Sequence, residues 1–343
     1  MKYYAGLDVS TQETAVCVVD ADGGIIAEKK VATDPDEIGG YLASLGIELE
    51  RVGLESGPCS PWLYQALVLG KLPAVCICAR HASATLKAQN VKTDKNDARG
   101  IAHIMRTGWY RLSHVKSDES QKTRVLINTR KTLLGQRYEI ENQIRGTLKV
   151  FGFKVGPVAA SQFESRIRGL LELQSTLHSY VEPLLSIRRH LMAECRELDR
   201  RIQKMVKQDE LCQRLMTVPG VGVLTALLFK CTIDDPRRFK KSADVGVHLG
   251  LTPRKYASGE VDYNGRITKS GDPMMRSCLY EAASAVMRRN ARNTALKEWG
   301  GRIAKRSCRK SAFVAVSRKL AVLMHRMWID GTEFREQPDV AAA

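Results

Sequence analysis

Hydrophobic and polar residues alternate over short runs in the N-terminal third of the chain. Residues 3–10, 14–20 and 24–32 are rich in β-branched and aromatic side chains, and the stretch DADGG joins the second run to the third. Runs of this kind, joined by a turn that contains glycine, are typical of antiparallel strands. Residues 51–56 and 73–79 form two further apolar runs, and the second is suited to a buried strand. The pattern predicts a five-stranded sheet.

Helices are expected between and after these strands. Ser60 and Pro61 fit the N-cap and first position of one helix, and the stretch KTDKNDARG (92–100) begins another that continues through IAHIMRTG. Three antiparallel strands followed by alternating helices and strands are the order expected of a ribonuclease-H-like domain. We assign this α/β domain, of the RuvC type, to residues 1–118.

The middle of the chain, residues 119–206, is predicted to be helical. Apolar residues recur there at every seventh position and at intermediate positions, which is the pattern of a coiled-coil seam. The recurring residues are Leu177, Leu184, Leu191, Leu198 and Met205, with Val181, Cys195 and Ile202 between them. Pro183 interrupts the pattern and Arg188 occupies a seam position, so the continuous coil is expected over 184–206. A hairpin within one chain and a coil between chains both remain open.

The last part of the chain, residues 207–335, is predicted to be mainly helical. Gly220 and Gly222 lie in a VPGVG stretch between two apolar helical runs. This resembles a helix-hairpin-helix turn, whose free N–H groups can hold a phosphate, although a tight structural connection would have the same sequence. A basic cluster follows, which indicates either phosphate contacts or a solvated helix face. Its members are Arg237, Arg238, Lys240 and Lys241.

The composition favours a polyanionic partner. The chain of 343 residues has a formal net charge of +17, and it has no apolar run near the ~20 residues that span a bilayer. Nucleic acid is therefore a better candidate than a membrane. The nine cysteines are scattered and form no C-x-x-C pair, which favours reduced thiols in a cytoplasmic protein over a structural zinc site.

Four acidic residues stand out in this basic chain. Asp8 lies between apolar residues within the first predicted strand, where a charge is costly without a partner, and Glu55 lies at the end of the fourth. Asp94 and Asp97 share one face of a predicted helix start. Each has an ordinary explanation, either solvation of a strand end or capping of a helix. Taken together, they match the oxygen-rich pockets that hold Mg²⁺ for phosphodiester chemistry.

The polar segment GLTPRKYASGEVDYNGRITKSGDPMMR (250–276) places Arg254, Lys255, Arg266 and Lys269 around Ser258. With GLDVS, LESG, KTDKNDARGIA and VPGVG, it follows the order of a known family. The chain resembles the transposases of bacterial insertion sequences that join a RuvC-like domain with a DEDD tetrad to a C-terminal serine domain. The resemblance covers roughly residues 3–290.

The resemblance implies a composite mechanism. Asp8, Glu55, Asp94 and Asp97 would bind Mg²⁺ (or Mn²⁺), and Ser258 would attack a DNA phosphate to form a covalent phosphoserine. It further implies donor and target DNA as partners and a structured guide RNA encoded by the element, in a nucleoid-associated location of a bacterial cytoplasm. The seam over 184–206 and the separation of Ser258 from the four acids along the sequence predict a dimer or tetramer. The two glycines and eight basic residues named above are the expected nucleic-acid contacts.

Three other functions compete with this interpretation. A RuvC-like nuclease would use the same acids to activate water, and a non-catalytic relative would only bind RNA or DNA. The stretch GLDVSTQETAV also resembles the phosphate loop of sugar kinases in the actin-like superfamily. The sequence has no second loop of this kind and no glycine-rich adenosine site, and the high positive charge has no use in such a kinase.

Overall fold

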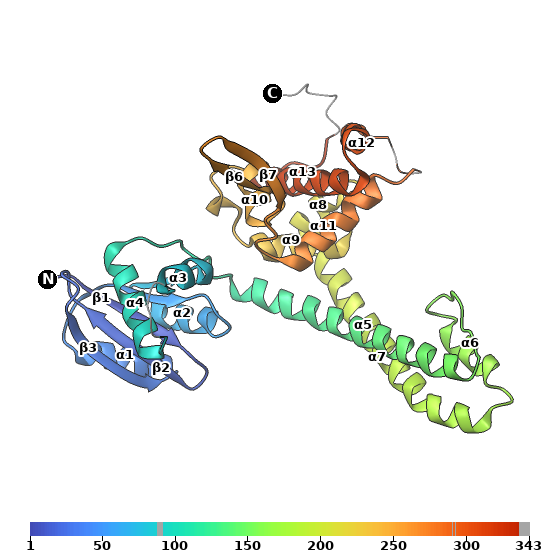
Figure 1. Ribbon diagram of the computed structural model, residues 1–343, viewed down its shortest axis with the longest axis horizontal. Helices are drawn as coiled ribbons and strands as arrows, with labels where there is room; N and C mark the ends of the chain where they lie inside the picture. The colour runs from blue at the N-terminus through green and yellow to red at the C-terminus, as the bar shows by residue number, and fades with distance from the viewer. Residues whose placement is uncertain (88–91, 290, 292, 336–343) are drawn as a thin grey trace. The chain divides into compact units, whose positions relative to one another are not determined.

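The structure is a computed structural model that describes residues 1–87, 92–289, 291 and 293–335 (Figure 1). The chain divides into two compact units, Met1–Lys116 and Ser117–Ala343. Each unit has its own hydrophobic core, and each is described separately below. Within the described residues, no helix is both long and apolar enough to cross a membrane.

The first unit is built on a five-stranded sheet with the strand order β3-β2-β1-β4-β5. The first three strands are antiparallel, while β4 runs parallel to β1 and β5 parallel to β4. The strands are β1 (Tyr3–Val9), β2 (Glu13–Val19), β3 (Ile25–Ala32), β4 (Leu49–Glu55) and β5 (Ala74–Ile77). All five predicted strands are present, and their order is consistent with a ribonuclease-H-like domain.

Helices cover both faces of this sheet. Side chains such as Leu7 and Leu54 pack against α1 (Pro35–Ser44) and α2 (Ser60–Leu69). The opposite face packs against α4 (Asp94–Thr107), which in turn contacts α3 (Ala79–Leu86). Because successive side chains of a strand point to opposite faces, the central strands β1 and β2 contribute to both cores. The sequence patterns had not predicted α1 or α3.

The second unit begins with a helical hairpin. The helices α5 (Asp118–Val150) and α7 (Ser175–Lys207) pack against each other, and α6 (Phe163–Leu170) adds apolar residues to their core (Figure 1). The chain therefore forms a hairpin within itself, while a coil between chains stays a prediction. The predicted interruption at Pro183 is wrong, because α7 continues through this residue. Pro183 is exposed, so the carbonyl that loses its helical partner can be hydrated.

The centre of the seam is shifted from the predicted leucines. Buried positions on α7 recur every seven residues, but they are Val181, Arg188, Cys195 and Ile202. The Arg188 side chain is only 3% exposed, and its Nε donates to Glu141 Oε1 at 2.8 Å. Its Nη2 donates to the Ala160 carbonyl at 2.6 Å, and the guanidinium stacks on Phe163. A seam arginine is tolerated because its charge and its donors are satisfied.

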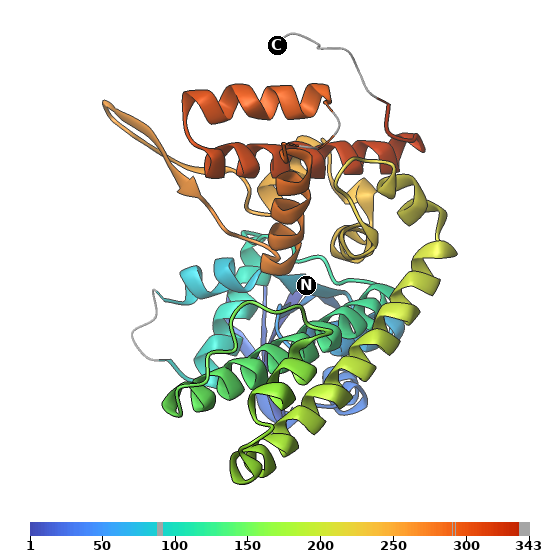
Figure 2. The same ribbon diagram turned by 90° about the vertical axis from the view of Figure 1, so that its right-hand side faces the viewer.

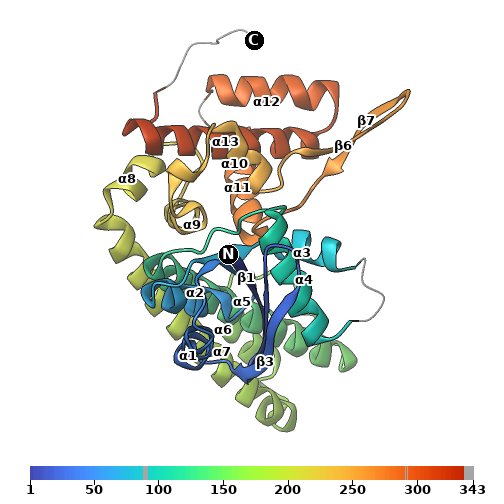
Figure 3. The same ribbon diagram turned by 90° about the vertical axis from the view of Figure 1, so that its left-hand side faces the viewer.

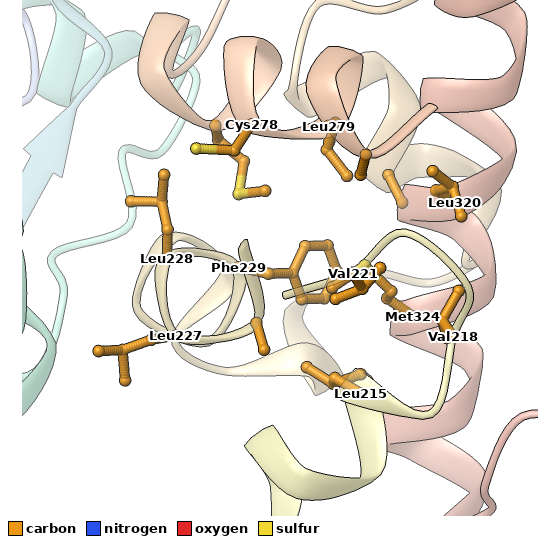
Figure 4. Packing of buried hydrophobic residues seen from close by; sticks show 14 of the residues in the cluster. Leu215, Val218, Val221, Leu227, Leu228, Phe229, Cys278, Leu279, Leu320 and Met324 are labelled. Atoms are coloured by element: carbon orange, nitrogen blue, oxygen red, sulfur yellow. The ribbon is translucent and has the colours of Figure 1, made fainter. Parts of the chain in front are cut away.

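The remainder of the second unit is a mostly helical domain around one core. Its central helix, α9, is buried on nearly all sides and contributes Phe229, which lies among Leu279, Leu320 and Met324 (Figure 4). The elements are α8 (Glu210–Met216), α9 (Val223–Ile233), η1 (Pro236–Arg238), α10 (Ala243–His248), β6 (Pro253–Ser258), β7 (Val261–Ile267), α11 (Pro273–Val286), α12 (Ala295–Arg306) and α13 (Arg309–Asp330).

The VPGVG stretch connects α8 to α9. Gly220 has a φ of +81°, and a Cβ at this position would lie 2.5 Å from the Ala282 carbonyl oxygen of α11. This glycine therefore has a packing role, because it brings the turn against α11. Gly222 precedes α9 and faces open space. Phosphate binding by Gly220 and Gly222 stays a prediction.

Candidate functional site

Two of the predicted acids lie next to each other on neighbouring parallel strands. Leu7 of β1 is paired with Leu54 of β4, so the residues that follow them, Asp8 and Glu55, occupy corresponding positions. Both are half-buried; Glu55 is the last residue of β4 and Asp8 is the last but one of β1. Both belong to the sheet face that packs on α4, because Leu7 and Leu54 point to the opposite face. The strand register thus brings two carboxylates together.

Glycines on the same sheet face let α4 approach closely. A Cβ on Gly6 would lie 2.2 Å from the Ala98 carbonyl oxygen and 2.3 Å from the Ala102 amide nitrogen, both in the backbone of α4. A Cβ on Gly53 would lie 2.5 Å from the Met105 side chain. The stretches GLD (6–8) and GLE (53–55) therefore follow the same pattern. In each, a glycine leaves room for α4, and an acid follows the glycine by two residues. Analysis of the sequence missed this repeat, although it was visible there.

The first turn of α4 supplies the other two acids. Thr93 caps the helix by accepting from Asn96 N at 3.2 Å, so the alternative that Asp94 is the cap is wrong. Asp97 is half-buried, whereas Asp94 is exposed and accepts from Lys30 Nζ at 2.8 Å. Lys30 lies on β3 and was not predicted as part of the site. A strand lysine more than sixty residues away from its partner leaves no local signal in the sequence.

The carboxylates interact electrostatically. Burial, followed by the negative charges of Asp97 and Asp94, raises the pKa of Asp8 to about 6. Burial and then the charges of Asp8 and Asp97 raise the pKa of Glu55. The Lys30 ammonium instead holds the pKa of Asp94 below its usual range. Asp8, Glu55 and Asp97 therefore form a region of concentrated negative charge that a cation would stabilise.

These residues fit a divalent metal in their chemistry. Four carboxylates without histidine or thiolate are the donors that Mg²⁺ and Mn²⁺ prefer. Within the described ranges, no three His, Cys, Asp or Glu side chains are arranged to hold a metal ion as they stand. The Asp94 carboxylate is engaged by Lys30. Metal binding would then require Asp94 to release this lysine.

Ser258 lies in the second unit, at the tip of a β-hairpin. It ends β6 and is paired with Val261, the first residue of β7. Gly259 has a φ of +56°, as the tight turn between the strands requires. Residues 253–260 are all exposed, and the hairpin extends away from the helices of its unit (Figures 2 and 3). The hydroxyl of Ser258 is therefore accessible to a large partner.

The base of this hairpin is firmly held. A Cβ on Gly250 would lie 2.3 Å from Ser270 N, and one on Gly271 would lie 2.1 Å from the His248 carbonyl oxygen, so the two chain segments are in close contact. Arg276 Nη1 donates to the Ser270 carbonyl at 2.6 Å. The Ser270 hydroxyl itself lies 3.0 Å from Thr268 Oγ1 within this base. Ser258 at the exposed tip is therefore more accessible than Ser270, which is half-buried in the base.

Most of the predicted basic contacts are free to meet a polyanion. Arg238 differs, because its Nε donates to the Ile233 carbonyl at 3.1 Å, and burial lowers its pKa. Its guanidinium also lies over the Phe239 ring, 4.4 Å from the centroid. These contacts within the protein account for Arg238 as well as phosphate binding would. The exposed members are Arg237, Lys240, Lys241, Arg254, Lys255, Arg266 and Lys269.

Two sequence models of protein families match the chain. Residues 5–152 match a model described as "Transposase", for the DEDD type, and residues 212–298 match one described as "Transposase IS116/IS110/IS902 family". The first match includes all four acids of the tetrad, and the second includes the hairpin that carries Ser258.

Individual relatives extend this similarity. The transposase for insertion sequence element IS1111A of Coxiella burnetii is 27% identical over 93% of this chain and 87% of its own length. A transposase for element IS1328 of Yersinia enterocolitica is 27% identical over 71% of this chain and 75% of its own length. A candidate transposase of Sinorhizobium fredii, y4pF/y4sB, is 29% identical over 71% of this chain, and the match spans 64% of that relative.

Proposed function

The chain belongs to the IS110/IS116 family of insertion-sequence transposases, and from this we propose that it is an RNA-guided DNA recombinase with a serine nucleophile. It would cut and rejoin DNA strands, using the acids of the first unit and Ser258 of the second. The observation that supports the proposal is the strand register that places Asp8 beside Glu55, together with Asp97 of α4, whose charge raises the pKa of both.

The four acids would hold Mg²⁺ or Mn²⁺. Such an ion, when bound, supplies positive charge beside the scissile phosphate and makes a hydroxyl more acidic. Asp8 and Glu55 are fixed by their strands, and Asp97 is fixed by the packing of α4 on Gly6. Lys30 would hold Asp94 through their ion pair when no metal ion is bound. Once Asp94 binds the ion, the Lys30 ammonium would be available to contact a DNA phosphate.

Ser258 would carry the covalent step. Its Oγ forms a bond to phosphorus, while the bond from phosphorus to the leaving deoxyribose oxygen breaks. The proton lost by the hydroxyl is balanced by the proton that the leaving oxygen gains. Rejoining reverses these changes with a new deoxyribose hydroxyl, so the energy of the phosphodiester bond is conserved without ATP. The exposed position of Ser258 beside Gly259 supports this role.

The partners proposed are donor and target DNA and a structured guide RNA from the same element. Base pairing would select the DNA sequence, which leaves the protein to hold backbones. The net charge of +17 and the exposed cations near the hairpin support such contacts. We further propose a dimer or tetramer as the active species. The sugar-kinase interpretation has no support from the family to which the chain belongs.

Asp8→Asn and Asp97→Asn test the metal site. Each removes one carboxylate charge while it leaves the basic surfaces unchanged, so strand cleavage should fall at least 100-fold and nucleic-acid binding should stay within about 2-fold. Cleavage of end-labelled DNA from the element, with the RNA that copurifies, measures the first quantity, and filter binding measures the second.

Asp36→Asn is the matched control, because Asp36 is an exposed acid of α1 on the far side of the sheet. It should cleave like the wild type. Neither Asp8→Asn nor Asp97→Asn should unfold the domain, because each relieves repulsion between partly buried carboxylates. Cleavage at the wild-type rate by either variant would contradict the metal site.

A further inference from the structure

The hairpin that presents Ser258 also presents two tyrosines. Tyr256 of β6 is directly paired with Tyr263 of β7, and their rings are stacked, with centroids 4.9 Å apart and an interplanar angle of 18°. The two residues are nevertheless 44% and 55% exposed. A large, flat aromatic surface thus lies open on a hairpin that is otherwise polar.

The aromatic pair and the serine share one face of the hairpin. Tyr256 precedes Ser258 by two residues on the same strand, and Tyr263 follows Val261, the pairing partner of Ser258, by two. Side chains two residues apart point to the same face, with a separation of about 7 Å along the strand. Stacked DNA rises about 3.4 Å per nucleotide, so this distance corresponds to one or two nucleotides.

The backbone makes room for these rings. A Cβ on Gly265 would lie 3.0 Å from Tyr256 Cε2, so glycine at this position lets the Tyr256 ring lie flat against the strand. Cross-strand aromatic pairs do stabilise hairpins, and this pair contributes to stability in the same way. Stability alone does not require the pair to lie on the face of Ser258, or half its surface to be open to solvent.

The charges on the hairpin favour a nucleic acid as the occupant. Over residues 253–269, the four cations Arg254, Lys255, Arg266 and Lys269 outnumber the acids Glu260 and Asp262. Of these cations, Lys255 is paired with Asp262 at 3.3 Å. Aromatic platforms flanked by cations are how proteins bind unstacked bases of single strands, largely independently of sequence.

We propose that Tyr256 and Tyr263 form a stacking platform for a base of the DNA strand that Ser258 attacks, one or two nucleotides from the scissile phosphate. This rests on the proposed role of Ser258 and adds two positioning residues to it. A base held on the rings would be unstacked from its neighbours, and its phosphate would be fixed near the serine hydroxyl. The platform thus positions the DNA and takes no part in the bond changes.

Photocrosslinking of the full-length chain tests the platform. The probe is a short oligothymidine DNA in which one base is replaced by 5-iodouracil, which couples to an aromatic ring stacked on it. Irradiation followed by peptide mapping should place the crosslink on Tyr256 or Tyr263. The double variant Tyr256→Leu/Tyr263→Leu should lose it and bind the oligonucleotide roughly 5- to 150-fold more weakly, as expected for loss of base stacking.

Two further variants separate stacking from hairpin stability. Tyr256→Phe/Tyr263→Phe keeps both ring faces and should bind and crosslink nearly as the wild type does. Tyr180→Leu makes the same change at a tyrosine of α7 that is 72% exposed, and it should have no effect. Hydrogen exchange over residues 253–267 should show that the leucine variant retains its strands. Loss of the strands together with binding would overturn the proposal, because the tyrosines would then act only through stability.

The test of base stacking on Tyr256 and Tyr263 is separate from the test of Ser258 as the nucleophile. Ser258→Ala should keep the crosslink although it cannot form a covalent adduct. An intact crosslink without any adduct in the wild type would leave the platform standing and remove the serine mechanism. Wild-type binding by the leucine variant, a crosslink elsewhere in the chain, or a crosslink found only with an iodouracil RNA would overturn the platform.

Discussion

At the scale of single residues, the candidate site depends on its glycines as much as on its acidic residues. Gly6 and Gly53 each precede an acid by two residues, and both face α4. Without a side chain at these positions, the helix can lie close enough for Asp97 to influence the pKa of Asp8 and Glu55. The acids were predictable from their types and positions, whereas the glycines become meaningful only once the helix is placed.

Gly6→Ala should disrupt the first unit. Its Cβ would meet the carbonyl oxygen of Ala98 at 2.2 Å, and backbone atoms of a helix cannot rotate away as a side chain can. We expect a loss of at least about 3 kcal/mol in the free energy of unfolding, the upper range for overpacked cores. Gly40→Ala, in α1 with open space around it, should instead stabilise by about 0.5–1 kcal/mol. Urea unfolding measures both, and equal stability of the two variants would contradict the packing described.

Glu28 gives the first unit a specific dependence on pH. A hydrogen bond from Arg99 of α4, aided by Lys95, lowers the pKa of Glu28 from 4.5 to about 2. A carboxylate whose pKa is lower in the folded than in the unfolded chain stabilises the fold at pH values above its unfolded pKa. This contribution disappears as the pH falls from 4.5 towards 2. The stability difference between wild type and Glu28→Gln should therefore be largest near neutral pH and shrink below about pH 4.5. Unfolding at a series of pH values measures it, and a constant difference would refute the assignment.

At the scale of elements, most strands of the sheet were predictable because they bury a run of apolar residues, whereas the largely exposed β3 was predictable from the glycine-containing turn before it. The helix α4 was predictable from its start at Thr93–Asp94, but its cap was not, since Thr93 and Asp94 are both good capping residues. The seam of α7 was predicted with the correct period and with Val181, Cys195 and Ile202 among its positions, but of the five residues named as its main repeat only Leu177 is buried. The other recurring leucines lie at its edge, because Arg188 and its partner Glu141 occupy a central position that apolar patterns do not reveal.

Arg188→Met should be costly although it makes the seam more apolar. It removes the donors that Arg188 supplies to the Glu141 carboxylate and the Ala160 carbonyl. It leaves Glu141 with Arg137, whose Nε lies 3.6 Å from Glu141 Oε1. Loss of one partner of a buried pair costs about 3–5 kcal/mol, and we expect the lower end of this range because Arg137 remains. The neighbouring Arg189→Met is the matched control. Its side chain is 53% exposed and pairs with Glu164 at the surface, so a loss below about 1 kcal/mol is expected. Denaturant unfolding of both variants decides the question, and similar losses would show that the buried pair has no special weight.

At the scale of the whole molecule, the proposed chemistry is divided between two units. The four acids belong to the first unit and Ser258 to the second, so a simple metal-dependent nuclease would need only the first. The sequence predicted this division, because the motifs that contain the four acids lie far along the chain from the segment that contains Ser258. It could not reveal that Ser258 ends a strand at the exposed tip of a hairpin, since the polar segment reads as a loop.

The covalent intermediate tests the central claim most directly. The full-length chain, with its copurifying RNA, is incubated with end-labelled DNA from the element, and the products are separated on a denaturing gel. We predict a labelled protein–DNA adduct that peptide mapping assigns to Ser258. It should be absent in Ser258→Ala, whose stability should change by no more than about 0.5 kcal/mol, and present in the control Ser270→Ala. Free DNA ends without an adduct, full recombination by Ser258→Ala, or an adduct on Ser270 would contradict the account.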